Sequence, residues 1–253
     1  MPDSPPGPLI HLKDNVWYFQ RDTSPGVTQP NVGVIRTADS TILIDAGNSP
    51  RHARRIITEL AAGGFPPVKT IIYTHHHWDH TFGAMGFNAE QVIAHQQCDA
   101  ILGEMAKKQW NQTTLQDEMQ QHPEFEVRNT GMISAIHQWH DFYVVPPTLS
   151  FTTSMTLYID DETTLHLAHV GGVHAEDSIS VWVQGANVMF LGDSYYPPPF
   201  HLRTPDNADN LALDMMKTFI TQDAAVYLDG HGDPRTLEEM QTMLDAEIAR
   251  QVI

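Results

Sequence analysis

The chain has 253 residues, with 14 Lys plus Arg against 31 Asp plus Glu, a formal net charge of −17 and a single cysteine. This charge would repel polyanions, so we expect no nucleic-acid partner, and Cys98 alone permits neither an intrachain disulfide nor a thiolate-rich metal site. No apolar run reaches the roughly 18 residues of a membrane span, and no basic segment followed by an apolar core stands at the start, so the sequence predicts a cytoplasmic protein without membrane contact.

The first part of the chain alternates strand-like and helix-like segments. Short apolar segments typical of strands stand at 16–19, 31–36 and 41–44. A helix is predicted over 50–62, where Ile56, Ile57 and Leu60 recur at helical spacing before Gly63 and Gly64. A buried strand at 68–73, a short strand at 92–94 and a helix at 96–110 follow.

The segment at about 107–145 differs in composition from the rest. It is rich in Gln, His, Met and Trp and lacks strand periodicity, so we expect a partly helical insertion. Its aromatic and apolar residues suggest a lid over a site, which implies a small-molecule substrate with a hydrophobic part. The alternative is a flap that packs on the core or on a second subunit of a homodimer.

Strand patterns resume in the last part of the chain, at 149–151, 156–159, 164–168, 179–183 and 188–191. A helix at about 207–221, a strand at 225–228 and a helix at about 235–251 complete it. Two similar halves packed sheet against sheet, with helices outside, would give a single α/β domain over 1–253. We therefore predict a four-layer αββα sandwich.

A histidine cluster, THHHWDH at 74–80, follows the apolar run VKTIIY. In His75-x-His77-x-Asp79-His80, three candidate ligands alternate and would project to one side if the chain stays extended, with the fourth at the turn beyond. Imidazole and carboxylate ligands without thiolate suit Zn²⁺, and also Fe or Mn. Taken alone, the cluster is also compatible with a solvated polar loop.

The pattern His75, His77, Asp79 and His80 resembles the H-x-H-x-D-H signature of the metallo-β-lactamase-fold hydrolase superfamily. The chain also resembles that family in ILIDAG at 42–47 and in three later segments, HVGGVHAEDSIS, VMFLGDSYY and VYLDGHGDP, which hold His174, Asp193 and His231. The resemblance implies the αββα fold and two metal sites. By it, one ion is held by His75, His77 and His174, the second by Asp79, His80 and His231, with Asp193 bridging them and Asp45 orienting a ligand imidazole.

The resemblance also implies the reaction. Two divalent ions, Zn²⁺ above all, would share a hydroxide that attacks the substrate, so no serine or cysteine nucleophile is needed. Because Asp79 and Asp193 are both present, the site looks like the glyoxalase II, lactonase and phosphodiesterase branches, and we predict hydrolysis of a carboxylic ester, lactone or thioester. The alternatives are β-lactam hydrolysis, a mononuclear iron oxygenase acting on thiols or persulfides, and a metal-stabilised binding module.

Catalytic roles are predicted for Asp79 and Tyr196. Tyr196 stands where acyl-homoserine lactonases carry a tyrosine that assists carbonyl binding, so its phenol would donate to the developing oxyanion. The alternative is that Tyr195 and Tyr196 only pack under the following prolines. Arg203 lies near the offset of a basic residue in glyoxalase II enzymes. The histidines outside the ligand positions are read as surface or packing residues: His76, His95, His137, His140, His166, His169 and His201.

Overall fold

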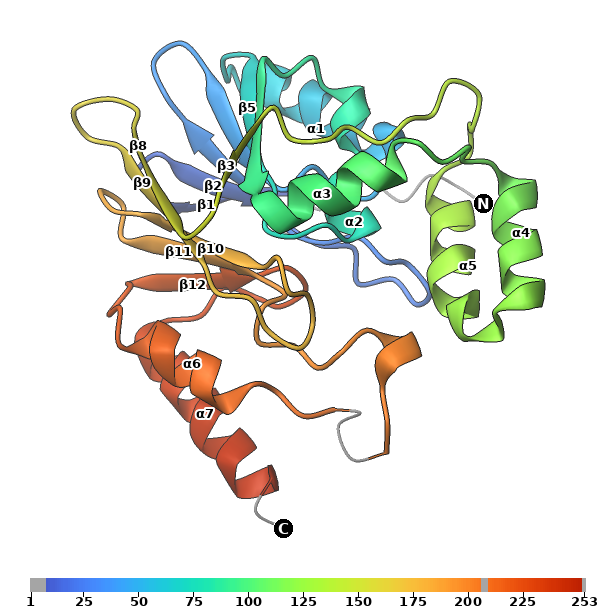
Figure 1. Cartoon of the computed structure of the whole chain (residues 1–253). Coiled ribbons are helices and arrows are strands. Elements are labelled where there is room, and N and C mark those ends of the chain that lie inside the picture. Colours follow the sequence, from blue (N-terminus) through green and yellow to red (C-terminus); the bar gives the residue numbers. More distant parts are fainter. Residues whose placement is uncertain (1–7, 206–208, 252–253) are drawn as a thin grey trace.

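A computed structural model describes residues 8–205 and 209–251. Two sheets face each other at its centre (Figure 1). The seven-stranded sheet, in spatial order β1 to β7, consists of Leu9–Lys13, Val16–Phe19, Val32–Arg36, Thr41–Ile44, Val68–Ile72, Gln91–His95 and Leu149–Phe151. The five-stranded sheet, in spatial order β12-β11-β10-β9-β8, consists of Val226–Asp229, Val188–Gly192, Ile179–Val183, Thr164–His169 and Ser154–Tyr158.

Helices cover the outer faces of both sheets (Figure 1). On the seven-stranded sheet lie α1 (Pro50–Ala62), α2 (Trp78–Thr81) and α3 (Gln96–Met105), and on the five-stranded sheet lie α6 (Leu213–Ile220) and α7 (Leu237–Gln251). The pair α4 (Gln112–Gln121) and α5 (Glu126–Ala135) stands beside the sandwich. The predicted four-layer αββα fold is confirmed. None of the helices in the described ranges is both long and apolar enough to cross a membrane.

Three apolar layers hold the sandwich together, and strand alternation explains them. Leu43 in β4 packs toward the helices of the first sheet, whereas its neighbours Ile42 and Ile44 pack between the two sheets. Residues at successive positions of a strand point to opposite faces, so a fully buried strand serves two cores at once. In the five-stranded sheet, Phe190 belongs to the inter-sheet core and Leu191 to the core under α6 and α7.

The structure corrects several predicted boundaries. The prediction that residues 149–151 open the second half is wrong, because β7 pairs in parallel with β6 and completes the first sheet. The helix predicted over 96–110 ends at Met105, whose carbonyl accepts a hydrogen bond from Trp110 Nε1 at 2.9 Å. The helix predicted from about 207 begins at Leu213, and residues 207 and 208 lie outside the described ranges. Strand β1 was not predicted.

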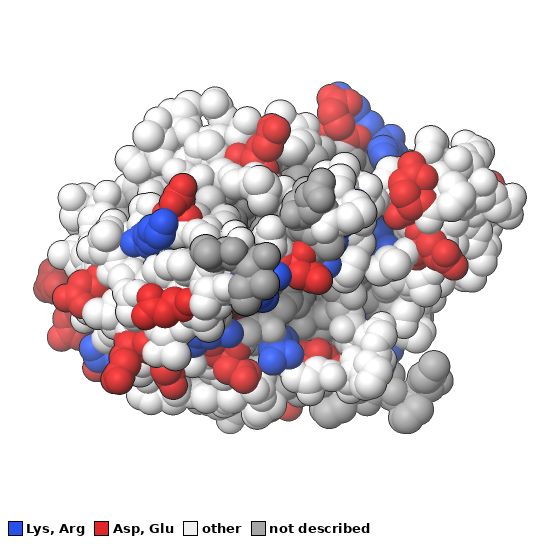
Figure 2. Space-filling view, turned by 90° about the horizontal axis from the view of Figure 1, so that it is seen from below, with Lys and Arg blue, Asp and Glu red and all other residues white. Residues whose placement is uncertain are grey.

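The face of the molecule seen in Figure 2 carries interspersed acidic and basic side chains. No continuous basic patch covers the described residues on that face, as expected from a chain with more than twice as many acidic as basic residues.

Candidate metal centre

The histidine cluster lies in the loop that leaves the end of β5, and its geometry differs from the prediction. The chain is not extended through Asp79, because His77 ends the loop and α2 begins at Trp78. The amide of His80 donates to the carbonyl of His77 at 3.1 Å, which closes the first turn. Asp79 and His80 are therefore presented by one helical turn, so they face different atoms from His75 and His77.

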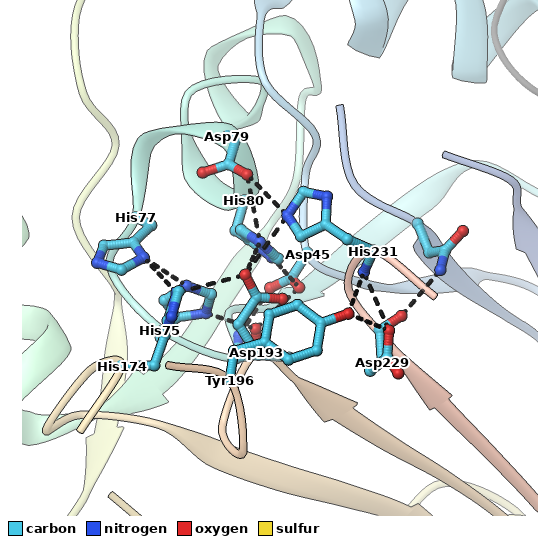
Figure 3. Close-up of polar contacts among 12 residues, drawn as sticks. Asp45, His75, His77, Asp79, His80, His174, Asp193, Tyr196, Asp229 and His231 are labelled. Carbon is cyan, nitrogen blue, oxygen red and sulfur yellow. Dashed lines mark hydrogen bonds and ion pairs between the residues drawn. The ribbon is translucent and has the colours of Figure 1, made fainter. Parts of the chain in front are cut away.

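The first candidate site is a group of three imidazoles. His77 Nδ1 lies 2.9 Å from His75 Nε2 and 3.0 Å from His174 Nε2. The imidazole of His174 reaches this group from the loop after β9, in the opposite sheet, and its Nδ1 donates to the carbonyl of Pro197 at 2.8 Å. That bond leaves His174 Nε2 as the free nitrogen, so three ring nitrogens converge on one point (Figure 3).

The second candidate site combines carboxylate and imidazole groups. His231 Nε2 lies 3.1 Å from Asp79 Oδ2, and His80 Nε2 lies 3.5 Å from the same oxygen. Ligand atoms of Asp79, His80 and His231 all lie within 4.8 Å of one another. This is the mixed nitrogen and oxygen donor set that borderline divalent cations accept.

Asp193 lies between the two groups (Figure 3). Its Oδ2 is 3.4 Å from His174 Nε2 in the first group, and 3.5 Å and 3.4 Å from the Nε2 atoms of His80 and His231 in the second. Asp193 follows β11, and 3% of the residue's surface is exposed. One buried carboxylate oxygen thus contacts both groups, which is the position that a bridging ligand requires.

Two observations show that the donor groups fit metal ions. His80 Nε2 and Asp193 Oδ1 are buried and have no hydrogen-bond partner among the described residues. Buried polar atoms without partners are costly, and bound cations would satisfy them. Burial first, and neighbouring imidazoles second, lower the pKa values of His75 and His77 well below the ordinary range, so both are neutral and ready to donate a lone pair.

The protonation of the second group points the same way. Burial alone would lower the pKa of His231, but Asp193 and Asp79 raise it to about 10. Burial likewise opposes protonation of His80, yet the carboxylates of Asp193 and Asp79 raise its pKa well above the ordinary range. Positive charge is therefore favoured at this point of the structure, whether protons or metal ions supply it.

Asp45 supports both groups from behind. Its Oδ2 accepts hydrogen bonds from His80 Nδ1 at 2.7 Å and from Thr74 Oγ1 at 2.9 Å, and Thr74 Oγ1 lies 3.1 Å from His75 Nδ1. Asp45 Oδ1 accepts the amide of Thr74 at 2.7 Å. These contacts fix the ring orientations of His75 and His80 and leave the Nε2 atom of each free toward the site.

Gly230 is required by the close approach of the His231 loop. A Cβ atom at this position would lie 2.1 Å from Asp193 Oδ1 and 2.7 Å from His80 Cε1. Any side chain here would occupy the space between the candidate ligands, which explains why glycine precedes His231.

Tyr196 is beside the site but its hydroxyl is engaged. It donates to Asp229 Oδ1 at 2.5 Å, and Tyr195, which is almost fully buried, donates to Asp229 Oδ2. Arg203 is not brought to the metal groups: its Nε donates to the carbonyl of Pro198 at 2.8 Å. The catalytic role predicted for Tyr196 therefore stays a prediction, and its hydroxyl would have to exchange partners to serve a substrate.

His76 was predicted to be a surface or packing residue, and its ion-pair partner was not predicted. Its Nδ1 pairs with Asp177 Oδ1 at 2.8 Å, and Asp177 is fully buried. The ring of His76 lines the large pocket described below, next to His77. Asp177 follows His174 by three residues, but this spacing does not predict the contact with His76, because only folding brings the two loops together. Within the described residues, the other histidines predicted as non-ligands lie outside the candidate metal groups.

A pocket of about 900 Å³ opens beside the first metal group. His76, His77 and His174 are among the residues that line it. Its wall is mainly apolar and comes from α2, the α3–α5 region, the loop at 172–176 and the segment at 199–202, including Trp78, Ile101, Met105, Trp110, Leu115, Met132, Val173, Pro199 and Leu202. The helical segment at 112–135 therefore contributes to a pocket that reaches the candidate ligands.

Comparison with known proteins agrees with this architecture. The chain is similar to a metallo-beta-lactamase from Pontibacter korlensis, with 16% identity, 94% of this chain and 97% of that chain covered, and a TM-score of 0.63. A metallo-beta-lactamase from Hirschia baltica gives 17% identity, 95% and 97% coverage, and a TM-score of 0.63. A double mutant of a sec-alkyl sulfatase gives 16% identity and a TM-score of 0.68 over 98% of this chain and 42% of that chain. At these identities the likeness concerns the fold.

One curated relative is similar in sequence over a short stretch. It is a linear primary-alkylsulfatase from a Pseudomonas species, 32% identical over 60 residues, which are 24% of this chain and 11% of that protein. The sequence model of the metallo-beta-lactamase superfamily matches a much longer part of the chain, residues 25–239. The chain therefore belongs to the metallo-β-lactamase superfamily.

Proposed function

We propose that the protein hydrolyses a carboxylic ester, lactone or thioester whose substituent is apolar. The observation that carries this proposal is the pocket of about 900 Å³, which is lined by the candidate ligands His77 and His174 and otherwise by predominantly apolar surface. Pockets of this size accept most of a drug-sized ligand, and an apolar wall selects for an apolar part of it. The predicted helical lid at about 107–145 fits this proposal, since α4 and α5 contribute Leu115 and Met132 to the wall.

The residues of the centre would divide the work. His75, His77 and His174 would hold one ion, and Asp79, His80 and His231 the other, with Asp193 contacting both. When bound there, two divalent ions, Zn²⁺ by the donor set, would supply a hydroxide nucleophile and polarise the substrate carbonyl. Tyr196 would donate a hydrogen bond to the developing oxyanion after its hydroxyl leaves Asp229. The apolar wall would orient the substrate and exclude water around it.

The test is a substrate panel on protein of measured metal content. The panel contains p-nitrophenyl acetate, butyrate and octanoate, an acyl thioester, an acyl lactone and a cephalosporin. We expect about two metal ions per chain and a higher kcat/KM for the octanoate than for the acetate. Preferred cleavage of the cephalosporin would favour β-lactam hydrolysis, whereas one iron per chain with oxygen uptake on a thiol would favour the oxygenase.

A second candidate reaction is hydrolysis of an alkyl sulfate ester. It is favoured by the 32% identity over 60 residues with the primary-alkylsulfatase. The same pocket would accept the alkyl chain of such a substrate. Release of sulfate from dodecyl sulfate, measured beside the ester panel, separates the two candidates, and sulfate release that exceeds octanoate hydrolysis would replace the first proposal by the second.

A further inference from the structure

The side-chain carboxylate of Asp229, the last residue of β12, accepts hydrogen bonds from several groups outside the sheet. Its Oδ1 accepts from Tyr196 at 2.5 Å, from the amide of His231 at 3.1 Å and from the amide of Gly232. Its Oδ2 accepts from Tyr195 and, at 2.7 Å, from Arg235 Nη1. Only 2% of the residue is exposed. Five donors thus converge on one buried carboxylate.

This arrangement determines where the loop of the candidate ligand His231 lies. The amides of His231 and Gly232 both point at Oδ1 of Asp229, so the loop curls around that oxygen (Figure 3). From the other side, Asn31 Nδ2 donates to the carbonyls of Asp229 and Gly232 at 2.8 Å and 2.7 Å. The backbone on both sides of His231 is therefore fixed by hydrogen bonds.

The contacts of Asp229 reach the second metal group and not the first. His231 Nε2, placed by this loop, faces Asp79 Oδ2 and Asp193 Oδ2. Within the described residues, no hydrogen bond joins Asp229 to His75, His77 or His174. Groups that hold a metal ligand in place commonly change metal affinity by 10–100-fold when they are removed.

We propose that Asp229 is a positioning residue that sets the metal affinity of the site formed by Asp79, His80 and His231, without binding the ion itself. This inference rests on the proposed dinuclear centre. The carboxylate acts through the backbone of His231, which its Oδ1 holds, whereas Arg235 Nη1 donates to the other oxygen, Oδ2, at 2.7 Å.

The test is a Zn²⁺ titration of the full-length protein in competition with a chromophoric chelator, with Asp229→Asn as the variant. Reference variants His77→Ala and His231→Ala assign each binding step to its site. We expect the step of the Asp79, His80 and His231 site to weaken by about 10–100-fold in Asp229→Asn, while the other step stays within about threefold. Unchanged steps, or an equal loss at both sites, would overturn the inference.

Matched controls remove other partners of the same carboxylate. Arg235→Met and Tyr195→Phe should lower the melting temperature and leave the affinity of the second step within about threefold, because the contacts to the His231 loop remain. A loss as large as that of Asp229→Asn would show that general packing is responsible. If Asp229→Asn does not fold, the test uses the double variant Asp229→Asn/Arg235→Met, which also removes the partly buried cation that would lose its partner. A wild-type protein that binds one ion would overturn the dinuclear proposal itself, before any variant is compared.

Discussion

At the scale of single residues, the candidate centre depends on one oxygen atom. Asp193 Oδ2 lies within 3.5 Å of nitrogen atoms from both groups of candidate ligands. Burial would raise the pKa of Asp193, but His231 and His80 hold it well below the ordinary range, so the carboxylate stays charged. A buried charge in contact with both groups couples the two sites, and its removal should affect both.

Asp193→Asn should therefore lower metal content and activity together. The amide keeps the shape of the side chain but loses its charge, and we expect kcat/KM to fall by on the order of 100-fold or more. Elemental analysis after dialysis at fixed free Zn²⁺, beside ester hydrolysis, measures both effects. The matched control is Asp214→Asn, a highly exposed aspartate that belongs to none of the candidate metal groups. Full metal content and rate in Asp193→Asn would contradict the bridging role.

Tyr196→Phe tests a different property, the donation of a hydrogen bond to the reacting carbonyl. If Tyr196 serves the oxyanion, the variant should keep both ions and lose about 10²-fold in kcat, because one donor to the developing charge is lost. Tyr195→Phe is the control, since Tyr195 is almost fully buried behind the site. An unchanged kcat in Tyr196→Phe would leave its hydroxyl as a support of Asp229 only.

At the scale of secondary-structure elements, α1 contains a buried histidine without polar partners. Both ring nitrogens of His52 are buried and lack hydrogen bonds among the described residues. Burial, followed by the charge of Arg55, lowers the pKa of His52 to about 3, against 6.5 for the ordinary side chain. The unfolded chain therefore takes up a proton as the pH falls through 6.5, whereas the folded chain does not until about pH 3.

This difference predicts that His52 makes the protein less stable in mild acid. The contribution of neutral His52 to the free energy of unfolding is fully present above pH 6.5. It is lost as the pH falls from 6.5 toward 3, by about 1.4 kcal/mol per pH unit. Between pH 7.5 and 5.5, the wild type should lose about 1.4 kcal/mol more unfolding free energy than His52→Leu, measured by urea denaturation. Parallel pH dependence in the two proteins would contradict the prediction, whatever the stability of the variant at neutral pH.

The helices α3 to α5 determine which substrates fit, if the pocket binds them. Ile101 in α3 lines the pocket and is partly exposed, so Ile101→Trp should fill space without disturbing a packed core. We expect kcat/KM for p-nitrophenyl octanoate to fall by about tenfold or more, which corresponds to about 1.4 kcal/mol, while the acetate ester is little affected. Val127→Trp, at a position 61% exposed and outside the pocket lining, is the control. An equal loss of kcat/KM on both esters would argue that the pocket does not bind the alkyl chain of the substrate.

At the scale of the whole molecule, the centre joins the two sheets. The ligand candidates His75, His77, Asp79 and His80 follow a strand of the seven-stranded sheet, and His174, Asp193 and His231 follow strands of the five-stranded sheet. Bound ions would connect the halves of the sandwich. Because such ions bind the folded chain and not the unfolded one, they would stabilise the folded state. At a free metal concentration of 1,000 times Kd, the gain is about 4 kcal/mol.

Removal of metal should therefore lower the melting temperature by roughly 8–16 °C, since 1 kcal/mol shifts a domain of this size by about 2–4 °C. Differential scanning calorimetry before and after dialysis against a chelator measures the shift, and readdition of Zn²⁺ should restore it. His231→Ala should reduce the shift, whereas Arg54→Ala, at an exposed position in α1, should not. If the melting temperature of the wild type does not change with metal, bound ions do not connect the two sheets.

The sequence alone determined the fold class, most of the elements and the order of the candidate ligands. Strand alternation and helical spacing depend on near neighbours in the chain, so segments such as 41–44 and 50–62 were predicted with the bounds that the structure has. The signature from His75 to His80 and the later His174, Asp193 and His231 could be found in order. The local conformation of the signature could not, because the turn at Trp78 depends on what packs around it.

Only the tertiary structure decided which atoms meet. Asp229 and Tyr196 are 33 positions apart, and Asp177 and His76 are 101 apart, so their hydrogen bonds have no signal in local spacing. The pocket wall likewise combines α3, α4 and α5 with loops that follow strands of both sheets. A sequence specifies local conformation through neighbouring residues, whereas the supporting contacts and the shape of the pocket arise from the way the two sheets and their helices pack.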